Sequence, residues 1–468
     1  MTIRFDESLP AFVKVMAESF NMAIVEKSVF VRDAGGKLSV IIDEDIDESI
    51  IGIFAKYYSD VLGPYARPDR VIAGKNAPGA KRLLKEAKDV NPIFVSGCLV
   101  RVLDRRIVGM DWLRTPQVSK SKTPRLVFAS LKGGVGRSTA LCVVAAYLSR
   151  RGRRVLAIDF DLEAPGIGTM LLNEKELPRF GTLDYFVESG ISGIDNEFIA
   201  DISGESYLGA RGGRVTVVPA IGKETLANPE NALGKIARAY IDSSDEDGTP
   251  NGLTEKLISL VTRFEDTGAY DIVLIDARAG LHETTAAAIL GLGGDVLLFG
   301  TDQPQTFIGY KLLMAHLARF PIDLENDWRS NLRFVHAKSS DSPENQKYAA
   351  ERFESLFSVV DDSVNEKKKH SDREYLDPSD EMYYTNNEVE LTEFDFETEW
   401  LQDESDVDRE SSFSAPSTLH VLDDGRYRDF DPLSDKKLLA SSTFYASFGE
   451  LIEYVDEIMD DLIAENHD

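Results

Sequence analysis

The 468-residue chain contains only two cysteines, Cys98 and Cys142, and each lies in an apolar stretch without a second Cys or a His at metal-ligand spacing. Isolated cysteines of this kind are typical of buried thiols, whereas a disulfide framework or a zinc site needs several ligands at short spacing. The cysteines therefore indicate neither type of site, and we expect a reduced, cytoplasmic protein.

Long hydrophobic runs are also missing. The longest apolar stretches, near residues 141–148 and 284–300, end or are interrupted by Gly or Asp before the roughly 20 residues that a membrane-spanning helix needs. The opening sequence "MTIRFDESLPAFVK" has neither the basic start nor the apolar core of a signal peptide. The sequence therefore predicts no membrane association.

Positive charge is scarce. Lys and Arg number 52 against 80 Asp and Glu, which gives a formal net charge of −28. Binding to DNA or to anionic lipid depends on Lys and Arg side chains that neutralise phosphates. This charge balance therefore argues against nucleic acid as a partner.

Apolar residues make up 43% of the chain, enough for the cores of two or three domains. Residues 1–118 predict an N-terminal α+β domain, with a helical pattern in 9–23, a hairpin around "DAGG" in 27–42 and an amphipathic helix in 47–63. The polar, proline-containing stretch 115–124 has linker composition. We interpret the N-terminal domain as a sensor or a partner-binding unit.

From residue 125 onward, short Val/Ile/Leu-rich runs alternate with helical segments. Such runs are typical of strands buried on both faces, and the helices between them supply the crossovers of a parallel sheet. The sequence therefore predicts an α/β domain over 125–468, with a doubly wound, mostly parallel sheet. The expected strands are 125–130, 154–160, 215–220, 271–277, 295–301 and 332–337, followed by a last strand within 417–424.

Two further segments complete this domain. Residues 361–417 are acidic, polar and weakly periodic, so we interpret them as a flexible insertion. A final helix is expected from Ser441 to Ala464, with one apolar face and one acidic face. Because membrane-surface helices usually carry Lys and Arg on the polar face, this helix is predicted to pack on the α/β core.

The segment "LVFASLKGGVGRSTALCVVAAYL", residues 126–148, places a glycine-rich loop between a predicted strand and a helix expected to begin at Ser138. Glycines allow backbone N–H groups to turn inward around an anion, and the helix start adds the positive end of its dipole. The context therefore predicts a nucleotide-phosphate site. Its expected nucleotide-binding residues are Gly133, Gly134, Val135, Gly136, Arg137, Ser138 and Thr139.

The sequence "KGGVGRST" resembles the deviant Walker A signature of the MinD and ParA group of P-loop ATPases, in the variant that reads KGGVGR. The resemblance covers residues 125 to about 340 well, returns weakly near 418–464 and does not include 1–118. Leu131 stands where ordinary P-loops have a Gly. The resemblance implies a P-loop NTPase fold, ATP and Mg²⁺ as cofactors, and a nucleotide-dependent homodimer.

The resemblance also implies roles for individual side chains. Ser138, Asp159 and Asp276 correspond to residues at the Mg²⁺ ion, with Asp276 as the Walker B carboxylate at the end of "YDIVLIDA". Asp161 corresponds to the switch aspartate that positions the attacking water. Lys132 corresponds to a lysine that crosses a dimer interface to the nucleotide of the partner, as an arginine finger does.

Base recognition stays open. In the family, a strand corresponding to "LRFVHAKSS" supplies an Asn to adenine, whereas this chain offers His336 and Lys338. The loop "DDGRYRDFDP", residues 423–432, is either a second base contact or a plain surface turn.

Arg137 stands where P-loops place the lysine that reaches the phosphates. Arginine keeps its charge and presents a planar fork that suits phosphate oxygens, so phosphate binding is expected to survive. Arginine is also bulkier than lysine, which leaves the rate of hydrolysis open. Arg278 and His282 follow Asp276 in the segment expected to respond to the γ-phosphate, although a solvated role fits them equally well.

These features predict an ATP-binding, slowly hydrolysing dimerisation switch that signals its nucleotide state to a protein partner. A nucleotide-binding scaffold or sensor without turnover is the main alternative, and Arg137 is its main support. A DNA-partitioning ATPase would need a basic surface on the dimer. A P-loop tyrosine kinase would need a dense C-terminal tyrosine cluster, and only Tyr383 and Tyr384 adjoin.

Overall fold

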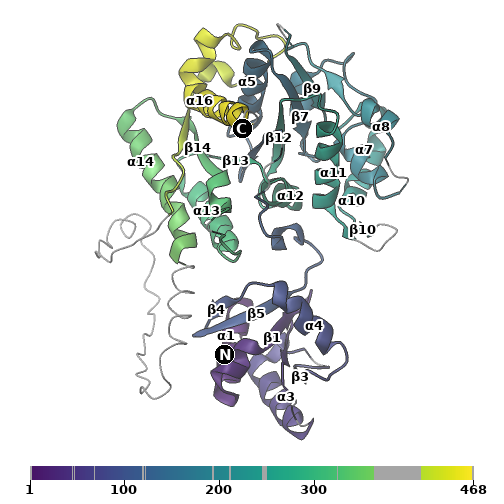
Figure 1. Cartoon of the computed structure of the whole chain (residues 1–468), viewed down its shortest axis with the longest axis vertical. Coiled ribbons are helices and arrows are strands. Elements are labelled where there is room, and N and C mark those ends of the chain that lie inside the picture. Colours follow the sequence, from purple (N-terminus) through teal and green to yellow (C-terminus); the bar gives the residue numbers. More distant parts are fainter. Residues whose placement is uncertain are drawn as a thin grey trace.

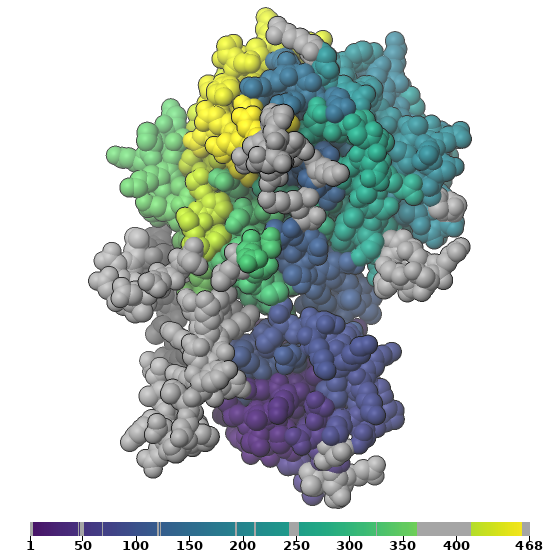
Figure 2. Space-filling view, in the orientation of Figure 1, coloured from purple at the N-terminus to yellow at the C-terminus, as the bar shows by residue number. Residues whose placement is uncertain are grey.

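The computed structural model of the chain contains a five-stranded and an eight-stranded sheet, joined by the segment that follows residue 104 (Figure 1). It describes residues 3–44, 46, 48–67, 69–118, 121, 123–191, 194–209, 212–244, 250–323, 325–362 and 413–465. Most of the predicted acidic insertion therefore lies outside the described residues. In the space-filling view the N-terminal residues gather below a larger body that contains the rest of the described chain (Figure 2).

The N-terminal sheet has the strand order β3-β2-β1-β5-β4. The predicted hairpin is present, since β1 and β2 pair antiparallel, and β1 also pairs parallel with β5. The predicted helical pattern in 9–23 is present but divided, because α1 ends at Ser19 and the Asn21 side chain caps a second helix. The elements are α1 (Phe5–Ser19), α2 (Met22–Lys27), β1 (Val29–Arg32), β2 (Leu38–Ile42), α3 (Glu48–Leu62), β3 (Ile72–Gly74), α4 (Ala80–Glu86), β4 (Ile93–Val95) and β5 (Cys98–Asp104).

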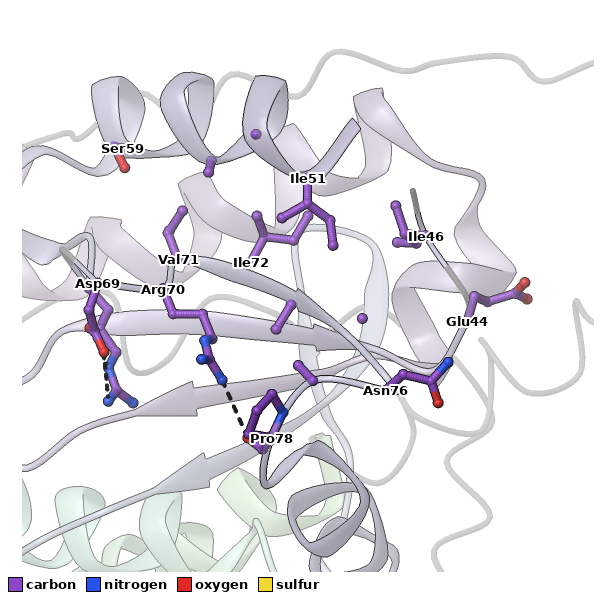
Figure 3. A pocket seen from close by; sticks show the side chains of 16 residues that line it. Glu44, Ile46, Ile51, Ser59, Asp69, Arg70, Val71, Ile72, Asn76 and Pro78 are labelled. Carbon is purple, nitrogen blue, oxygen red and sulfur yellow. Dashed lines mark hydrogen bonds and ion pairs between the residues drawn. The ribbon is translucent and has the colours of Figure 1, made fainter. Parts of the chain in front are cut away.

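A hollow of about 540 Å³ opens at the edge of this sheet, beside β3 and α3 (Figure 3). Ile51 and Ile72 give it an apolar wall, and Glu44 and Arg70 give it charged groups. Arg70 donates from Nη1 to the Pro78 carbonyl at 3.3 Å. The N-terminal unit thus offers a concave surface of mixed polarity.

The second sheet has the order β15-β14-β13-β6-β12-β7-β9-β8, and within the described residues only β8 runs antiparallel to its neighbour. The predicted doubly wound, mostly parallel sheet is confirmed. The short edge strand β8 was not predicted. The strands are β6 (Arg125–Ser130), β7 (Arg154–Asp159), β8 (Gly204–Glu205), β9 (Arg214–Val218), β12 (Ile272–Ala279), β13 (Asp295–Gly300), β14 (Leu332–Ser339) and β15 (Leu419–Leu422), with a separate small pair, β10 (Ser243–Ser244) and β11 (Pro250–Asn251).

Helices cover both faces of this sheet (Figure 1). Alternate residues of β6 enter different cores, since Val127 packs in one and Phe128 in the other. The first core holds side chains of α11, α12 and α13, and the second holds those of α5 and α16. The helices are α5 (Arg137–Arg150), α6 (Ile167–Leu171), α7 (Thr182–Glu188), α8 (Asn196–Asp201), α9 (Lys223–Ala227), α10 (Ala232–Ala239), α11 (Leu253–Glu265), α12 (Glu283–Gly291), α13 (Pro304–Leu317), α14 (Pro343–Glu354) and α16 (Ser441–Glu465).

The terminal helix α16 packs on the α/β core, as its acidic outer face predicts. Phe444, Phe448, Leu451 and Val455 are buried in the core that also contains α5. Within the described residues, no helix combines the length and the apolar character that crossing a membrane requires.

Replacement of Phe448 by Ala is expected to lower the free energy of unfolding by about 3–5 kcal/mol, because the side chain is only 3% exposed and its loss leaves a cavity. The matched control is Tyr445→Ala on the same helix, where the side chain is 40% exposed and the loss should stay below about 1 kcal/mol. Chemical denaturation measures both. Equal losses for the two variants would contradict the packing of α16.

Two histidines join β14 to the last strand. His336 and His420 face each other in register, and their Nδ1 atoms lie 3.2 Å apart, so one ring donates and the other accepts. Burial, and then the neighbouring His420, lower the pKa of His336 to about 4. Burial and the neighbouring ring therefore favour the neutral form of His336.

The His336 pair makes stability depend on pH. Its pKa is lower in the folded than in the unfolded chain, so protonation favours unfolding, and its contribution is lost as the pH falls from about 6.5 towards 4. For this one group the loss is at most about 1.4 kcal/mol per pH unit. Between pH 6.5 and pH 4, we expect the free energy of unfolding to fall less in His336→Gln than in the wild type. Chemical denaturation at several pH values measures both. Identical pH slopes would show that another group is responsible.

Candidate functional site

The glycine-rich loop, residues 131–136, connects β6 to α5. The helix begins at Arg137, one residue earlier than predicted. Gly134 and Gly136 have φ angles of 74° and 92°, a left-handed region that strains other residues. A Cβ built on Gly133, Gly134 or Gly136 meets no atom of the described chain within 4 Å. The loop therefore needs glycine for its backbone shape, and its outer side is open.

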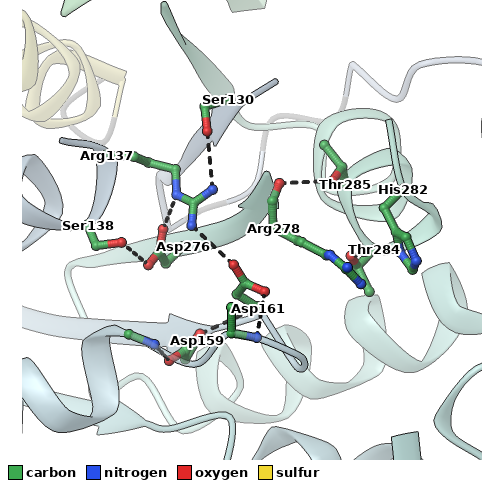
Figure 4. Close-up of polar contacts among 12 residues, drawn as sticks. Ser130, Arg137, Ser138, Asp159, Asp161, Asp276, Arg278, His282, Thr284 and Thr285 are labelled. Atoms are coloured by element: carbon green, nitrogen blue, oxygen red, sulfur yellow. Dashed lines mark hydrogen bonds and ion pairs between the residues drawn. The ribbon is translucent and has the colours of Figure 1, made fainter. Parts of the chain in front are cut away.

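Arg137 lies at the centre of a buried polar network (Figure 4). Its Nε donates to Asp276 Oδ1 at 2.5 Å, its Nη2 to Asp161 Oδ2 at 3.4 Å and its Nη1 to Ser130 Oγ at 3.3 Å. Only 10% of the side chain is exposed. The fork thus contacts carboxylates here, and its predicted contact with phosphates stays a prediction.

Two of the three predicted metal-binding residues, Asp159 and Asp276, lie opposite each other on the neighbouring strands β7 and β12, and Ser138 contacts Asp276 from the first turn of α5. Ser138 Oγ donates to Asp276 Oδ2 at 2.7 Å, and Asp159 accepts from the backbone N–H groups of Asp161 and Gly166 at 3.1 and 3.0 Å. Burial, and then the charge of Asp276, raise the pKa of Asp159 to about 8. Burial also raises the pKa of Asp276, and Arg137 opposes this shift.

The arrangement fits a small hard cation. A Cβ on Gly166 would lie 3.6 Å from Ser138 Oγ and 3.9 Å from Asp276 Oδ2, so Gly166 lies directly beside these oxygens. In the described part of the chain, no group of three or more His, Cys, Asp and Glu side chains is arranged as a metal cage. Magnesium rarely uses such a cage, because it prefers one or two carboxylates, a hydroxyl, water and phosphate oxygens.

Asp161 is the second residue of the loop that we name switch I, residues 160–166. It is 5% exposed, accepts from the Ala164 N–H at 3.2 Å and contacts Arg137. Burial raises the pKa of Asp161, and Arg137 is the main opposing influence. Asp161 thus reaches the same network as the metal candidates.

The segment 277–282, which we name switch II, contacts switch I through Glu163. Arg278 forms an ion pair with Glu163, and His282 Nε2 lies 3.9 Å from the same carboxylate. The Tyr240 hydroxyl donates to Glu163 Oε1 at 2.7 Å. Arg278 and His282 were predicted in this segment, whereas Glu163 and Tyr240 were missed. The only signal was that Glu163 follows Asp161 by two residues.

The remaining predicted residues occupy different environments. Lys132 is exposed on the loop, Val135 is buried beneath it, and Thr139 is half-buried in the first turn of α5. Two residues were considered for contact with the nucleotide base. His336 is buried against His420, while Lys338 is exposed near the end of β14 with a left-handed φ of 54°. Lys338 is therefore the one of these two that faces solvent.

The chain is similar to known nucleotide-binding proteins. Residues 126–370 match the family described as the CobQ/CobB/MinD/ParA nucleotide binding domain. Over 178 residues, 38% of this chain, the sequence is 48% identical to the chromosome-partitioning ATPase Soj of Thermus thermophilus. The chain covers 55% of that relative, about half of its length.

Three solved structures are similar in part. The Pyrococcus furiosus cell division ATPase MinD is 22% identical with a TM-score of 0.33, over 48% of this chain and 79% of that one. The Cyanothece McdA complex with ATP is 14% identical with a TM-score of 0.39, over 74% and 98%. A Mycobacterium smegmatis cobyrinic acid a,c-diamide synthase with a bound ATP analogue and magnesium is 19% identical with a TM-score of 0.32, over 48% and 79%.

The matched family model spans more than half of the chain, and its first residues are the strand and the glycine-rich loop described above. The chain belongs to the CobQ/CobB/MinD/ParA family of nucleotide-binding domains.

Proposed function

We propose that the chain is an ATP-binding, slowly hydrolysing dimerisation switch that signals its nucleotide state to a protein partner. The observation that supports this most is the hydrogen-bonded network in which Arg137 and Ser138, directly after the glycine-rich loop, meet Asp161 and Asp276. Family membership adds a nucleotide-binding fold to this set of residues.

Each part of the network has a proposed task. The N–H groups of residues 133–139 bind the phosphates at the start of α5. Ser138, Asp159 and Asp276 would hold Mg²⁺, which supplies positive charge to the β- and γ-phosphates when bound. Asp161 would orient the attacking water from switch I. Switch II would then respond to the γ-phosphate through Arg278.

Residues 1–118 are the unit to which we assign sensing or partner binding. The hollow beside β3 supports this assignment, because it places Arg70 and Glu44 next to apolar side chains. A surface of this kind suits a ligand with both charged and apolar groups. Binding of DNA is not part of the proposal, because the net charge of −28 opposes contact with phosphates.

Lys132 is proposed to act across the dimer. Its exposed position on the loop leaves its ammonium group able to reach a second subunit. We expect Lys132→Ala to bind ATP but to lose ATP-dependent dimers and hydrolysis, as measured by sedimentation velocity and phosphate release. The control is Lys175→Ala, which removes another exposed lysine. A wild type that sediments as one unchanged species without nucleotide, with ADP and with ATP would contradict the switch.

Arg137 is proposed to act within its own subunit, first on the carboxylates and then on the phosphates. Charge-assisted hydrogen bonds are worth about 1.5–3 kcal/mol, so Arg137→Ala should weaken the affinity for MgATP about tenfold or more. Arg137→Lys keeps the positive charge but loses the planar fork. Its affinity for MgATP should lie between those of the wild type and Arg137→Ala. Calorimetric titration measures all three proteins. Unchanged affinity in Arg137→Ala would show that this side chain does not bind phosphate.

Nucleotide binding without turnover is the second candidate function. The contact between Arg137 and Asp161 favours it, because the proposed water-positioning carboxylate is already held by a cation. Phosphate release under saturating ATP separates the two functions. Bound ATP with no detectable release would favour the scaffold.

A further inference from the structure

The segment that joins the two sheets, residues 105–118 (the connecting segment), is fixed to the nucleotide-binding body. Asp111 accepts a hydrogen bond from the Thr254 hydroxyl at 2.6 Å, and His316 Nε2 lies 2.6 Å from the Trp112 carbonyl oxygen. Trp112 itself is 7% exposed and packs in the core of the large sheet. The connecting segment is therefore anchored on α11 and α13 rather than passing freely between the two units.

One contact of this segment reaches the end of switch II. Glu283 is the first residue of α12, and it directly follows the switch II residue His282. Its Oε1 accepts from the backbone N–H groups of Gly109 and Met110, the latter at 3.3 Å. Gly109 has a φ of 81°, so the chain turns here in a way that favours glycine. A single carboxylate thus binds two successive amides of the connecting segment.

On its other side, switch II is held by the nucleotide site. Arg137 contacts Asp161, Glu163 follows two residues later, and Glu163 pairs with Arg278. Short covalent steps and direct polar contacts therefore run from the phosphate-binding loop to Glu283. Coupling between distant sites needs an element that both sites bias, and switch II contacts Glu163 on one side and is directly followed by Glu283 on the other.

We propose that Glu283 is a positioning residue that joins switch II to the connecting segment, so that the nucleotide state of the loop sets the placement of the N-terminal unit. This inference rests on the proposed function and names the route of its signal. The coupling is reciprocal, so a partner that fixes the N-terminal unit also changes the affinity for nucleotide.

The connecting segment contains exposed apolar side chains next to the contact with Glu283. Ile107 and Val108 are 86% and 73% exposed, next to the two amides that Glu283 binds. Release of these amides would free the apolar turn from α12. The bonds of Asp111 and Arg114 to α11 do not involve switch II and should keep the rest of the segment in place.

The test is hydrogen–deuterium exchange of the full chain without nucleotide, with MgADP and with a non-hydrolysable ATP analogue and Mg²⁺. In the wild type we expect exchange of peptides within residues 105–112 to change severalfold between the ADP and ATP-analogue states. In Glu283→Ala, which removes the acceptor of both amides, that difference should disappear. The control is Glu255→Gln, which weakens the ion pair between Arg114 and α11 and should keep the difference.

A second variant guards against a general folding defect in Glu283→Ala. Met110 has a φ of −65°, which suits proline, so Met110→Pro removes one donor to Glu283 while leaving the carboxylate in place. It should reduce the nucleotide-dependent difference in the same peptides.

The outcomes separate this inference from the proposed function. A wild type that binds neither nucleotide contradicts the proposed function. A wild type that binds both, without any change of exchange in 105–112, overturns the inference alone. A full nucleotide-dependent difference retained in Glu283→Ala also overturns it.

Discussion

The site depends on the bonds that one buried arginine makes with two carboxylates. Arg137 is the cation placed between Asp161 and Asp276, and burial disfavours the ionised form of both acids. A buried carboxylate without such a partner is costly, so Arg137 keeps switch I, the loop and β12 together. Binding of MgATP brings both a competing cation and competing anions into this network. In our account Arg137 then exchanges its carboxylate partners for phosphates.

The parallel sheet explains why these residues meet. Strands β6, β7 and β12 are neighbours, and their carboxyl ends carry the glycine-rich loop, switch I and switch II. Ligands of open α/β sheets bind outside these ends. Each switch therefore begins at the nucleotide site and leads away from it. Because switch I and switch II contact each other through Glu163, we expect a change of bound nucleotide to affect both.

Most of the fold could be predicted from the sequence, because buried parallel strands and glycine-rich loops are local patterns. The positions of Ser138, Asp159 and Asp276 at strand or loop ends could be predicted for the same reason. Contacts between residues far apart could not. Neither the ion pair of Glu163 with Arg278 nor the His336 pair follows from spacing, since both depend on the register of strands. The direction of the Arg137 side chain depends on the groups around it. From the sequence alone we predicted a contact with phosphates, whereas in the structure it contacts carboxylates.

The most direct test of the account is a crystal structure of the full chain with Mg²⁺ and a non-hydrolysable ATP analogue. We predict that the Arg137 guanidinium has left Asp276 and contacts phosphate oxygens, and that Mg²⁺ lies between Ser138 and Asp276. Nucleotide bound on the loop while Arg137 remains paired with Asp276 and Asp161 would contradict the exchange of partners on which the account rests.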